Sequence, residues 1–407
     1  MSHFKEPIYQ VLADTRLESS LTKGQTIARS YASDVQVNDM GGDGGYSTQA
    51  ITDTQETLVI NKEKEASIYI KKLDELQAHL PLKQKYGRKL AQALVNQIDG
   101  DVLLAMYQGA GTTLDAGDFG GTAGQGYTIT ASNVATVFTK AMEKLRLKNV
   151  VYNKRFQSGT KLEVPEGMPV AAISPEILTF VELYLGGKDS LLGDQVSRNG
   201  YSGYFMGFNM FVSNALPWTA TLNLATIPTA GDTITINGVT LTAAADNSAA
   251  TAGEFSIETT NDLAAANLVL LINGTGTAGA DEYIDVSAAN RRLLKNITAT
   301  YDASADTLTL TSSGWGTVVV SETLTAAADV WTTTKQQLHC LFALSKSCSL
   351  VVQKDPSLDE NFVSAKIGRD YIAWTAYGIK VFTDQAPQIV QLAVNSSSFT
   401  ASDTTPQ

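Results

Sequence analysis

The residues most able to do chemistry are few in this sequence. The chain has 407 residues but only 3 histidines and 2 cysteines. His339 and Cys340 are adjacent and Cys348 follows closely, which suggests a metal site or a Cys–His pair. No fourth ligand has suitable spacing, and a nucleophilic pair is defined in space rather than by adjacency. We therefore interpret the two cysteines as small buried apolar residues of a hydrophobic element.

Motifs of catalysis and of phosphate binding are also missing from the sequence. No nucleophile elbow, dinucleotide fingerprint or His-Glu-x-x-His pattern occurs. Gly186-Gly187-Lys188 resembles the end of a phosphate-binding loop, but Asp189 stands where that loop needs Ser or Thr. The end of a helix followed by a turn is the better interpretation.

Two acidic groups are candidates for calcium sites. Asp281-Glu282 with Asp285, and Asp39 with Asp43, lack the regular ligand spacing of a calcium loop. We predict no catalytic residue, no cofactor and no metal ion. An enzyme, for instance a hydrolase using His339 or Cys340, remains as an alternative.

The composition narrows the class of protein further. Apolar residues make up 43% and charged residues 17% of the chain, which is ordinary for a globular protein. The formal net charge of -11 argues against a protein whose main work is to grip nucleic acid through a basic face. Two cysteines fit a reduced, cytoplasmic origin better than a disulfide scaffold. We predict neither a secretion signal nor a membrane span, because no suitable apolar run occurs.

The clearest periodic signal predicts one long helix. Apolar residues recur at every fourth position, namely Leu82, Tyr86, Leu90, Leu94, Ile98, Val102 and Met106. This core stripe predicts a helix roughly 40 Å long at about 1.5 Å rise per residue. Gly87 and Gly100 lie inside the helix, each at a cost of about 1 kcal/mol relative to Ala. Either the helix bends at these glycines or another element packs closely there.

The segments before this helix predict an arm and a hairpin. Residues 1–45 are polar and end in Met40-Gly-Gly-Asp-Gly-Gly45, which is typical of an extended arm. Thr57–Ile60 and Ala66–Ile70 are β-like runs on either side of a charged segment. We interpret residues 46–72 as a long hairpin with this segment at its tip, where its alternating charges could pair with a neighbouring subunit. The segment consists of Asn61, Lys62, Glu63, Lys64 and Glu65.

Downstream of the long helix, the sequence predicts a compact α/β part and a separate acidic segment. A helix begins near Asn133, and a buried strand at 170–173 precedes the helix start Ser174-Pro175-Glu176. Residues 218–338 hold 12 acidic and 4 basic residues and read as short strands around a helix at 261–272. Asn237-Gly238 there predicts a tight hairpin. We interpret 218–338 as a self-contained domain that is either α+β or mostly β.

Four segments, taken in order, resemble the major capsid proteins of tailed bacteriophages. They are 57–104 with Gln97-Ile98-Asp99-Gly100-Asp101, 162–175 with Leu162-Glu-Val-Pro165, 203–217 ending in Leu216-Pro217, and 341–382. The resemblance implies an α+β capsid fold with an N-terminal arm, an extended hairpin loop, a spine helix, and peripheral and axial domains. Residues 218–338 interrupt the resemblance as an inserted domain.

The resemblance also implies a domain organisation. We expect an arm at 1–45 and the extended loop at 46–72. The spine helix, the peripheral domain and the first part of the axial domain follow at 73–217. After the insertion at 218–338, residues 339–407 complete the axial and peripheral domains.

The function implied is that of a structural subunit that assembles, as hexamers and pentamers, into an icosahedral shell around double-stranded DNA, without sequence-specific binding. We expect a virion capsid location after assembly in the host cytoplasm, and no membrane association. Expected partners are a separate scaffolding protein, a portal and decoration proteins. Family shells expand during maturation, so Gly87 and Gly100 are hypothetical hinges, and residues 61–65 are a hypothetical assembly interface. A shell protein of a cargo compartment, similar to encapsulins, and a phage tail or adhesion component are the alternatives.

Overall fold

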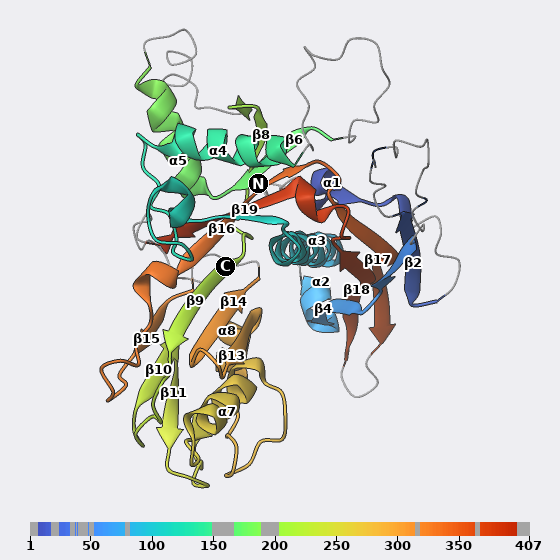
Figure 1. Cartoon of the computed structure of the whole chain (residues 1–407). Helices are drawn as coiled ribbons and strands as arrows, with labels where there is room; N and C mark the ends of the chain where they lie inside the picture. Colours follow the sequence, from blue (N-terminus) through green and yellow to red (C-terminus); the bar gives the residue numbers. More distant parts are fainter. Residues whose placement is uncertain are drawn as a thin grey trace. The chain divides into compact units, whose positions relative to one another are not determined.

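The computed structural model describes residues 7–17, 24–32, 53–77, 82–148, 167–188, 203–313, 318–362 and 367–396, with the isolated residues 37, 39 and 48. The chain divides into two compact units (Figure 1). In described residues, unit 1 comprises those within 13–95 and 348–382. Unit 2 comprises those within 7–12, 96–347 and 383–396. Both units therefore combine segments that are far apart in the sequence.

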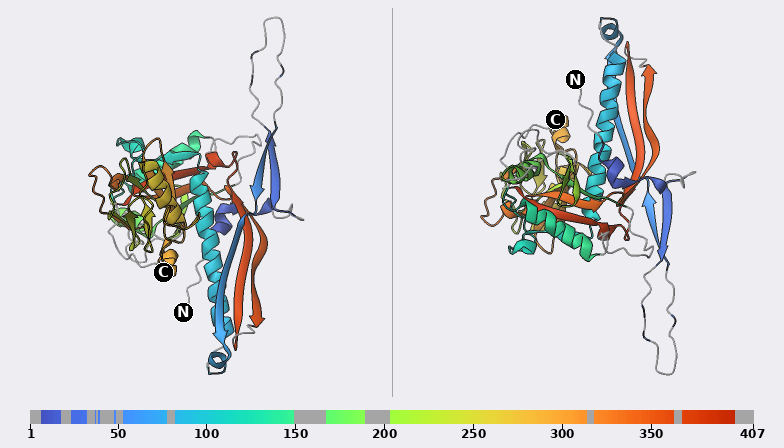
Figure 2. Two further views of the ribbon diagram at one scale, coloured as in Figure 1. Left: turned by 90° about the horizontal axis from the view of Figure 1, so that it is seen from below. Right: turned by 90° about the horizontal axis from the view of Figure 1, so that it is seen from above.

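Unit 1 is built on a four-stranded sheet with the order β1-β17-β18-β4. These strands are β1 (Ala13–Asp14), β17 (Cys348–Phe362), β18 (Gly368–Lys380) and β4 (Lys62–Lys71). A short helix, α2 (Lys72–Gln77), follows β4 directly. A separate antiparallel pair consists of β2 (Thr26–Ala32) and β3 (Asp53–Val59). Figure 2 shows α2 and this pair at opposite ends of unit 1.

The predicted long helix is present as α3 (Leu82–Gln108), with 27 residues. The stripe changes its environment along the helix. Its first three residues, Leu82, Tyr86 and Leu90, are half-buried. The last four are fully buried: Leu94 and Ile98 are each 2% exposed, and Val102 and Met106 are 0% exposed. The four-residue spacing therefore predicted both the helix and the side it buries.

The predicted hairpin at 46–72 is wrong in its strand pairing. β3 pairs with β2, through Val59 with Thr26, whereas β4 pairs with β18, through Lys62 with Tyr377. The chain passes from one sheet to the other at Ile60 and Asn61 instead of folding back on itself. Two successive β-like runs predict two strands, but they do not predict the partner of either strand. Here each run pairs with a segment that is distant in the sequence.

The arm predicted at 1–45 is also more structured than expected. Residues 9–12 form α1 (Tyr9–Leu12), in which Leu12 is 1% exposed, and residues 26–32 form β2. The backbone N–H of Tyr9 donates to Oδ1 of Asp99 at 2.9 Å. Asp99 is 6% exposed and lies in the resemblance segment 97–101, so this carboxylate ties the first turn of α1 to α3.

Unit 2 contains a nine-stranded sheet. Seven strands follow the order β13 (Ile297–Asp302), β14 (Thr307–Ser312), β9 (Trp218–Asn223), β16 (Gln337–Leu344), β6 (Pro169–Ile173), β8 (Phe208–Val212) and β7 (Tyr204–Phe205). β19 (Ile389–Asn395) pairs with β16 and with β5 (Thr112–Leu114). All eight residues of β16 are buried, so this central strand forms the middle of the core.

Two helices near this sheet begin where the sequence predicts. In α4 (Val134–Leu147), the apolar residues at helical spacing are buried, namely Val134, Val137, Phe138, Ala141, Met142 and Leu145. In α5 (Pro175–Gly186), the Ser174 hydroxyl accepts the N–H of Ile177 at 3.4 Å and Pro175 occupies the first turn. Phe138 of α4 packs edge-on against Phe205 and Phe342, each with ring centroids 5.0 Å apart. These aromatic contacts fix α4 to the sheet.

The acidic segment 218–338 contributes to two sheets. Its own four-stranded sheet has the order β12 (Glu254–Ser256), β11 (Val239–Ala244), β10 (Thr233–Ile236) and β15 (Val320–Glu322). Asn237 and Gly238 have φ values of 50° and 78°, as the predicted tight turn requires. However, β9, β13 and β14 of this segment extend the nine-stranded sheet. The domain boundaries therefore stay a prediction.

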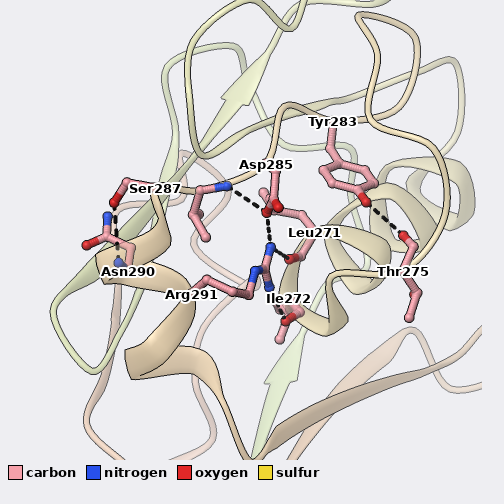
Figure 3. Close-up of polar contacts among 9 residues, drawn as sticks. Leu271, Ile272, Thr275, Tyr283, Asp285, Ser287, Asn290 and Arg291 are labelled. Atoms are coloured by element: carbon pink, nitrogen blue, oxygen red, sulfur yellow. Dashed lines mark hydrogen bonds and ion pairs between the residues drawn. The ribbon is translucent and has the colours of Figure 1, made fainter. Parts of the chain in front are cut away.

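Helices of the acidic segment are joined by one arginine (Figure 3). They are α7 (Asn261–Asn273) and α8 (Ala288–Leu294). From α8, the Arg291 guanidinium donates to the carbonyls of Ile272 at 2.9 Å and Leu271 at 2.8 Å, and it pairs with Asp285. The guanidinium thereby satisfies carbonyls that the end of α7 leaves without helical partners. Figure 1 shows α7, β10 and β11 at the end of unit 2 opposite to α4 and α5.

We predict that Arg291→Lys loosens the end of α7. A lysine cannot donate in a fixed fork to two carbonyls and a carboxylate, so the expected loss is about 1–3 kcal/mol of local stability. Hydrogen exchange of the amides at 270–275 measures this loss. Arg292→Lys, at an exposed neighbouring position, serves as the control and should leave exchange unchanged. Equal exchange in both variants would contradict the role of Arg291.

Candidate assembly elements

The charged segment 61–65 belongs to an edge strand and not to a hairpin tip. Lys62 and Lys64 lie opposite Tyr377 and Thr375 of β18, both of which are 0% exposed. Glu63 and Glu65 point to the other face of the sheet and are exposed. The alternation of charge thus matches the alternation of faces in a strand. The assembly interface predicted for these residues stays a prediction, without the tip geometry that suggested it.

The real hairpin of unit 1, β2 with β3, is held at its base by an apolar cluster. The cluster consists of Ile27, Leu58, Ile60, Val351 and Phe382, with Leu17 packed against it. Around it, Lys380 donates to the Thr57 carbonyl at 2.9 Å, and the Arg29 guanidinium lies 5.0 Å from the centre of the Phe382 ring. Burying these side chains anchors the hairpin to the end of β18. Residues 33–52, which connect the two strands, lie largely outside the described residues.

Gly378 lets the hairpin base and the sheet approach closely. A Cβ added there would lie 2.5 Å from the Val59 carbonyl oxygen and 2.8 Å from Cδ2 of Leu58. Only glycine fits this contact without displacing the backbone of β3. Gly378 is not among the residues predicted from the sequence, although a glycine within an otherwise apolar β-run is a signal of close backbone approach.

The two hypothetical hinge glycines lie inside a continuous helix. A Cβ at Gly87 would come 3.3 Å from Cδ2 of Leu358 in β17, so at this position a neighbour does pack closely. Gly100 is buried within α3. Close packing against Leu358 thus explains why a glycine fits at position 87. The hinge role of both glycines stays a prediction.

The histidine and cysteine side chains that could take part in catalysis are buried in the core. His339 is 3% exposed, its Nε2 lies 2.8 Å from the Thr219 hydroxyl, and its ring centroid lies 4.3 Å from that of Tyr107. Burial lowers the pKa of His339 to about 3, so the ring is neutral at pH 7. Cys340 and Cys348 are free and buried, and burial raises the pKa of both thiols to about 12. Such thiols are poor nucleophiles.

No metal-binding cluster forms in the part of the chain that the structure describes: no three His, Cys, Asp or Glu residues gather there. Of the earlier candidate acids, Asp285 is paired with Arg291, and Asp43 lies outside the described residues. Gly187 caps α5, as its interpretation as a helix end predicted. Among the described helices, none has the length and apolar character needed to cross a bilayer.

Comparisons with known proteins identify the fold. No protein-family profile and no curated protein sequence matches the chain. Among solved structures, one of Mycobacterium phage Che8 matches with a TM-score of 0.54 and 14% identity, over 96% of this chain and 93% of the other. The capsid structure of Cyanophage P-SCSP1u gives a TM-score of 0.49 and 12% identity, over 97% and 90% of the two chains.

The match to the Che8 structure extends over nearly the whole of both chains, so it concerns the complete architecture and not one local motif. The chain has the mixed α+β fold of the Che8 phage structure, which confirms the predicted α+β class. At this identity the match shows the fold alone, and the inserted domain remains a prediction.

We predict that Gly378→Ala displaces the hairpin base. The added methyl would overlap the Val59 carbonyl, which should lower stability by about 1–3 kcal/mol and raise hydrogen exchange in 26–32 and 53–59. Gly279→Ala is the control, because nothing lies within 4 Å of a Cβ at that position. Unchanged exchange at the hairpin in Gly378→Ala would show that the close contact is not a constraint.

We predict that His339 makes stability depend on pH. Its pKa falls from 6.5 to about 3 on folding, so between these values the unfolded chain binds the proton more tightly. Stability is therefore complete above pH 6.5 and declines as the pH falls, by about 2 kcal/mol at pH 5. His339→Gln, which does not titrate, should lose less stability between pH 7 and pH 5 in urea unfolding of the unassembled subunit. Parallel pH profiles for the two proteins would refute this assignment.

Proposed function

We propose that this chain is the structural subunit of an icosahedral phage capsid. The observation that carries the proposal is the match to the Che8 structure over almost the entire chain. Two features fit the role. The first is the hairpin β2–β3, whose base packs on an apolar cluster, and the second is the long helix α3. Extended elements of this kind let one polypeptide repeat its contacts at fivefold and sixfold positions with small changes of angle.

The role is structural, and we propose that it includes no catalysis. In the described residues, the only histidine is buried and neutral, and both thiols are buried and protonated. No observation favours either alternative, a cargo-compartment shell or a tail or adhesion protein, over the capsid subunit. The tail alternative in particular gives no role to the long helix.

The partners follow from this proposal. The chain assembles with copies of itself, as hexamers and pentamers, in the host cytoplasm and encloses double-stranded DNA without reading its sequence. A separate scaffolding protein, a portal and decoration proteins are the other expected partners. Residues 218–338 form an inserted domain that projects outward, because its excess of 12 acidic over 4 basic residues would repel DNA inside the shell.

Electron microscopy of the chain, expressed with the genes that flank its own, tests the proposal. We expect closed icosahedral particles with surface projections. A soluble subunit that never assembles, even with a scaffolding candidate present, would contradict the capsid role.

A shortened variant serves to locate the insertion in those particles. The N–H of Asn223 donates to the Val330 carbonyl at 3.1 Å, so residues 224–329 can be replaced by a short Gly-Ser linker. The replacement also removes β13 and β14, so β9 becomes the edge strand of the remaining sheet and pairs with β16 through Trp218 and Thr219. Particles of this variant should lack the projections, whereas density lost from the inner surface would place the insertion inside.

A further inference from the structure

The first half of α3 is strongly basic. From Leu82 to Ile98 the helix carries Lys83, Lys85, Arg88 and Lys89 and no acidic residue. All four side chains are exposed. This local excess of positive charge contrasts with the net charge of -11 of the whole chain. A surface of this kind attracts a negatively charged partner.

Only one of these four cations is neutralised within the described residues. Lys83 pairs with Glu360 of β17 at 2.6 Å and lies over the Tyr371 ring. For Lys85, Arg88 and Lys89, no carboxylate partner occurs in the described part of the chain. Their spacing of three and four residues places them on one helix face. We call these three residues the α3 basic face.

The α3 basic face points away from the sheet of unit 1. Gly87 marks the side of the helix that packs on the sheet, since a Cβ there would lie 3.3 Å from Leu358. Lys85 and Lys89 are two positions before and after Gly87, roughly 160° around the helix at 100° per residue. The basic face is therefore the solvent side of α3.

The opposite face of the same sheet carries charges of both signs, namely four carboxylates and the lysines Lys71 and Lys354. Strand pairing places Glu63, Glu65, Asp359 and Asp370 on the face that is turned away from α3. Trp374 lies among them, 38% exposed, and donates from its indole Nε1 to Asp359 at 2.9 Å. Lys62 and Lys64 of β4 lie on the face that α3 covers. The charges of β4 therefore separate over the two faces from Lys62 to Glu65, whereas Lys71 shares the face of Glu63 and Glu65.

We propose that unit 1 is oriented in the shell so that the α3 basic face lines the interior and contacts the phosphates of the enclosed double-stranded DNA. The inference rests on the proposed capsid function. The opposite face of the sheet then points outward. Contacts from lysine and arginine side chains to phosphates carry no sequence information by themselves, so the proposed contact is independent of base sequence.

Each subunit contributes few phosphate contacts, which suits a shell. Three cations on a subunit of net charge -11 give weak binding, and the packaged DNA stays free to slide. Many copies in a closed shell present the same face to one long polyanion, so the weak contacts act together. DNA is accordingly held near the wall without being bound tightly to any one subunit.

Two matched variants test the proposal on the soluble subunit. R88Q/K89Q removes one arginine and one lysine from the α3 basic face, and R292Q/K295Q removes the same residue types from exposed positions at the end of α8. The probe is a short fluorescent duplex DNA of random sequence, and the readout is the dependence of its affinity on salt. We expect the slope of log affinity against log salt to lose about 1.8 in R88Q/K89Q and to stay unchanged in the control.

The result that overturns the proposal is an equal loss in both variants or no loss in either. Circular dichroism of the two variants confirms that neither substitution changes the fold. A reconstruction of DNA-filled particles provides a second test. DNA density next to Lys85, Arg88 and Lys89 supports the proposal, whereas α3 on the outer surface overturns it while leaving the capsid role intact. If the unmodified chain forms no particles, the capsid role fails, separately from the outcome of the DNA titration.

Discussion

The continuous helix α3 is the constraint on which both units depend. Its backbone runs unbroken from Leu82 to Gln108, although the division between the units falls after Val95. One helix therefore meets two sets of demands. Its first half packs one side on a sheet and leaves a charged side in solvent, and its second half is buried at Ile98, Val102 and Met106. The apolar stripe fits both environments, because a half-buried helix and a fully buried helix can bury the same row of apolar side chains.

Features specified by neighbouring residues were predicted from the sequence. The four-residue spacing from Leu82 to Met106 gave α3, the cap at Ser174 gave the start of α5, and Asn237-Gly238 gave the hairpin of β10 and β11. Each of these signals acts over a few residues and reflects a local preference of the backbone or of one helix face. The resemblance to capsid proteins added the global fold, which no local pattern contains.

Features specified by distant residues could not be predicted in the same way. Leu58 and Ile68 both lie in β-like runs, but nothing in their neighbourhood indicates that the first run pairs with residues 26–32 and the second with residues 368–377. Pairing depends on the register and burial of partners far along the chain. For the same reason the candidate site was only partly predicted. The charged residues 61–65 stood out in the sequence, but the faces on which their charges lie became clear only from the strand pairing.

The edge position of β4 has a consequence for the subunit before assembly. An edge strand offers unpaired backbone groups to any other strand, including the same strand of a second copy. If two copies of β4 paired antiparallel about a twofold axis through the sheet, residues on matching faces would lie opposite each other. Lys62 and Lys64 share one face, and Glu63 and Glu65 share the other. Whenever two of these residues met, lysine would face lysine and glutamate would face glutamate, which is destabilising. The charges of β4 therefore disfavour edge-to-edge pairing of identical chains. Such pairing is a hazard for any protein that accumulates in many copies.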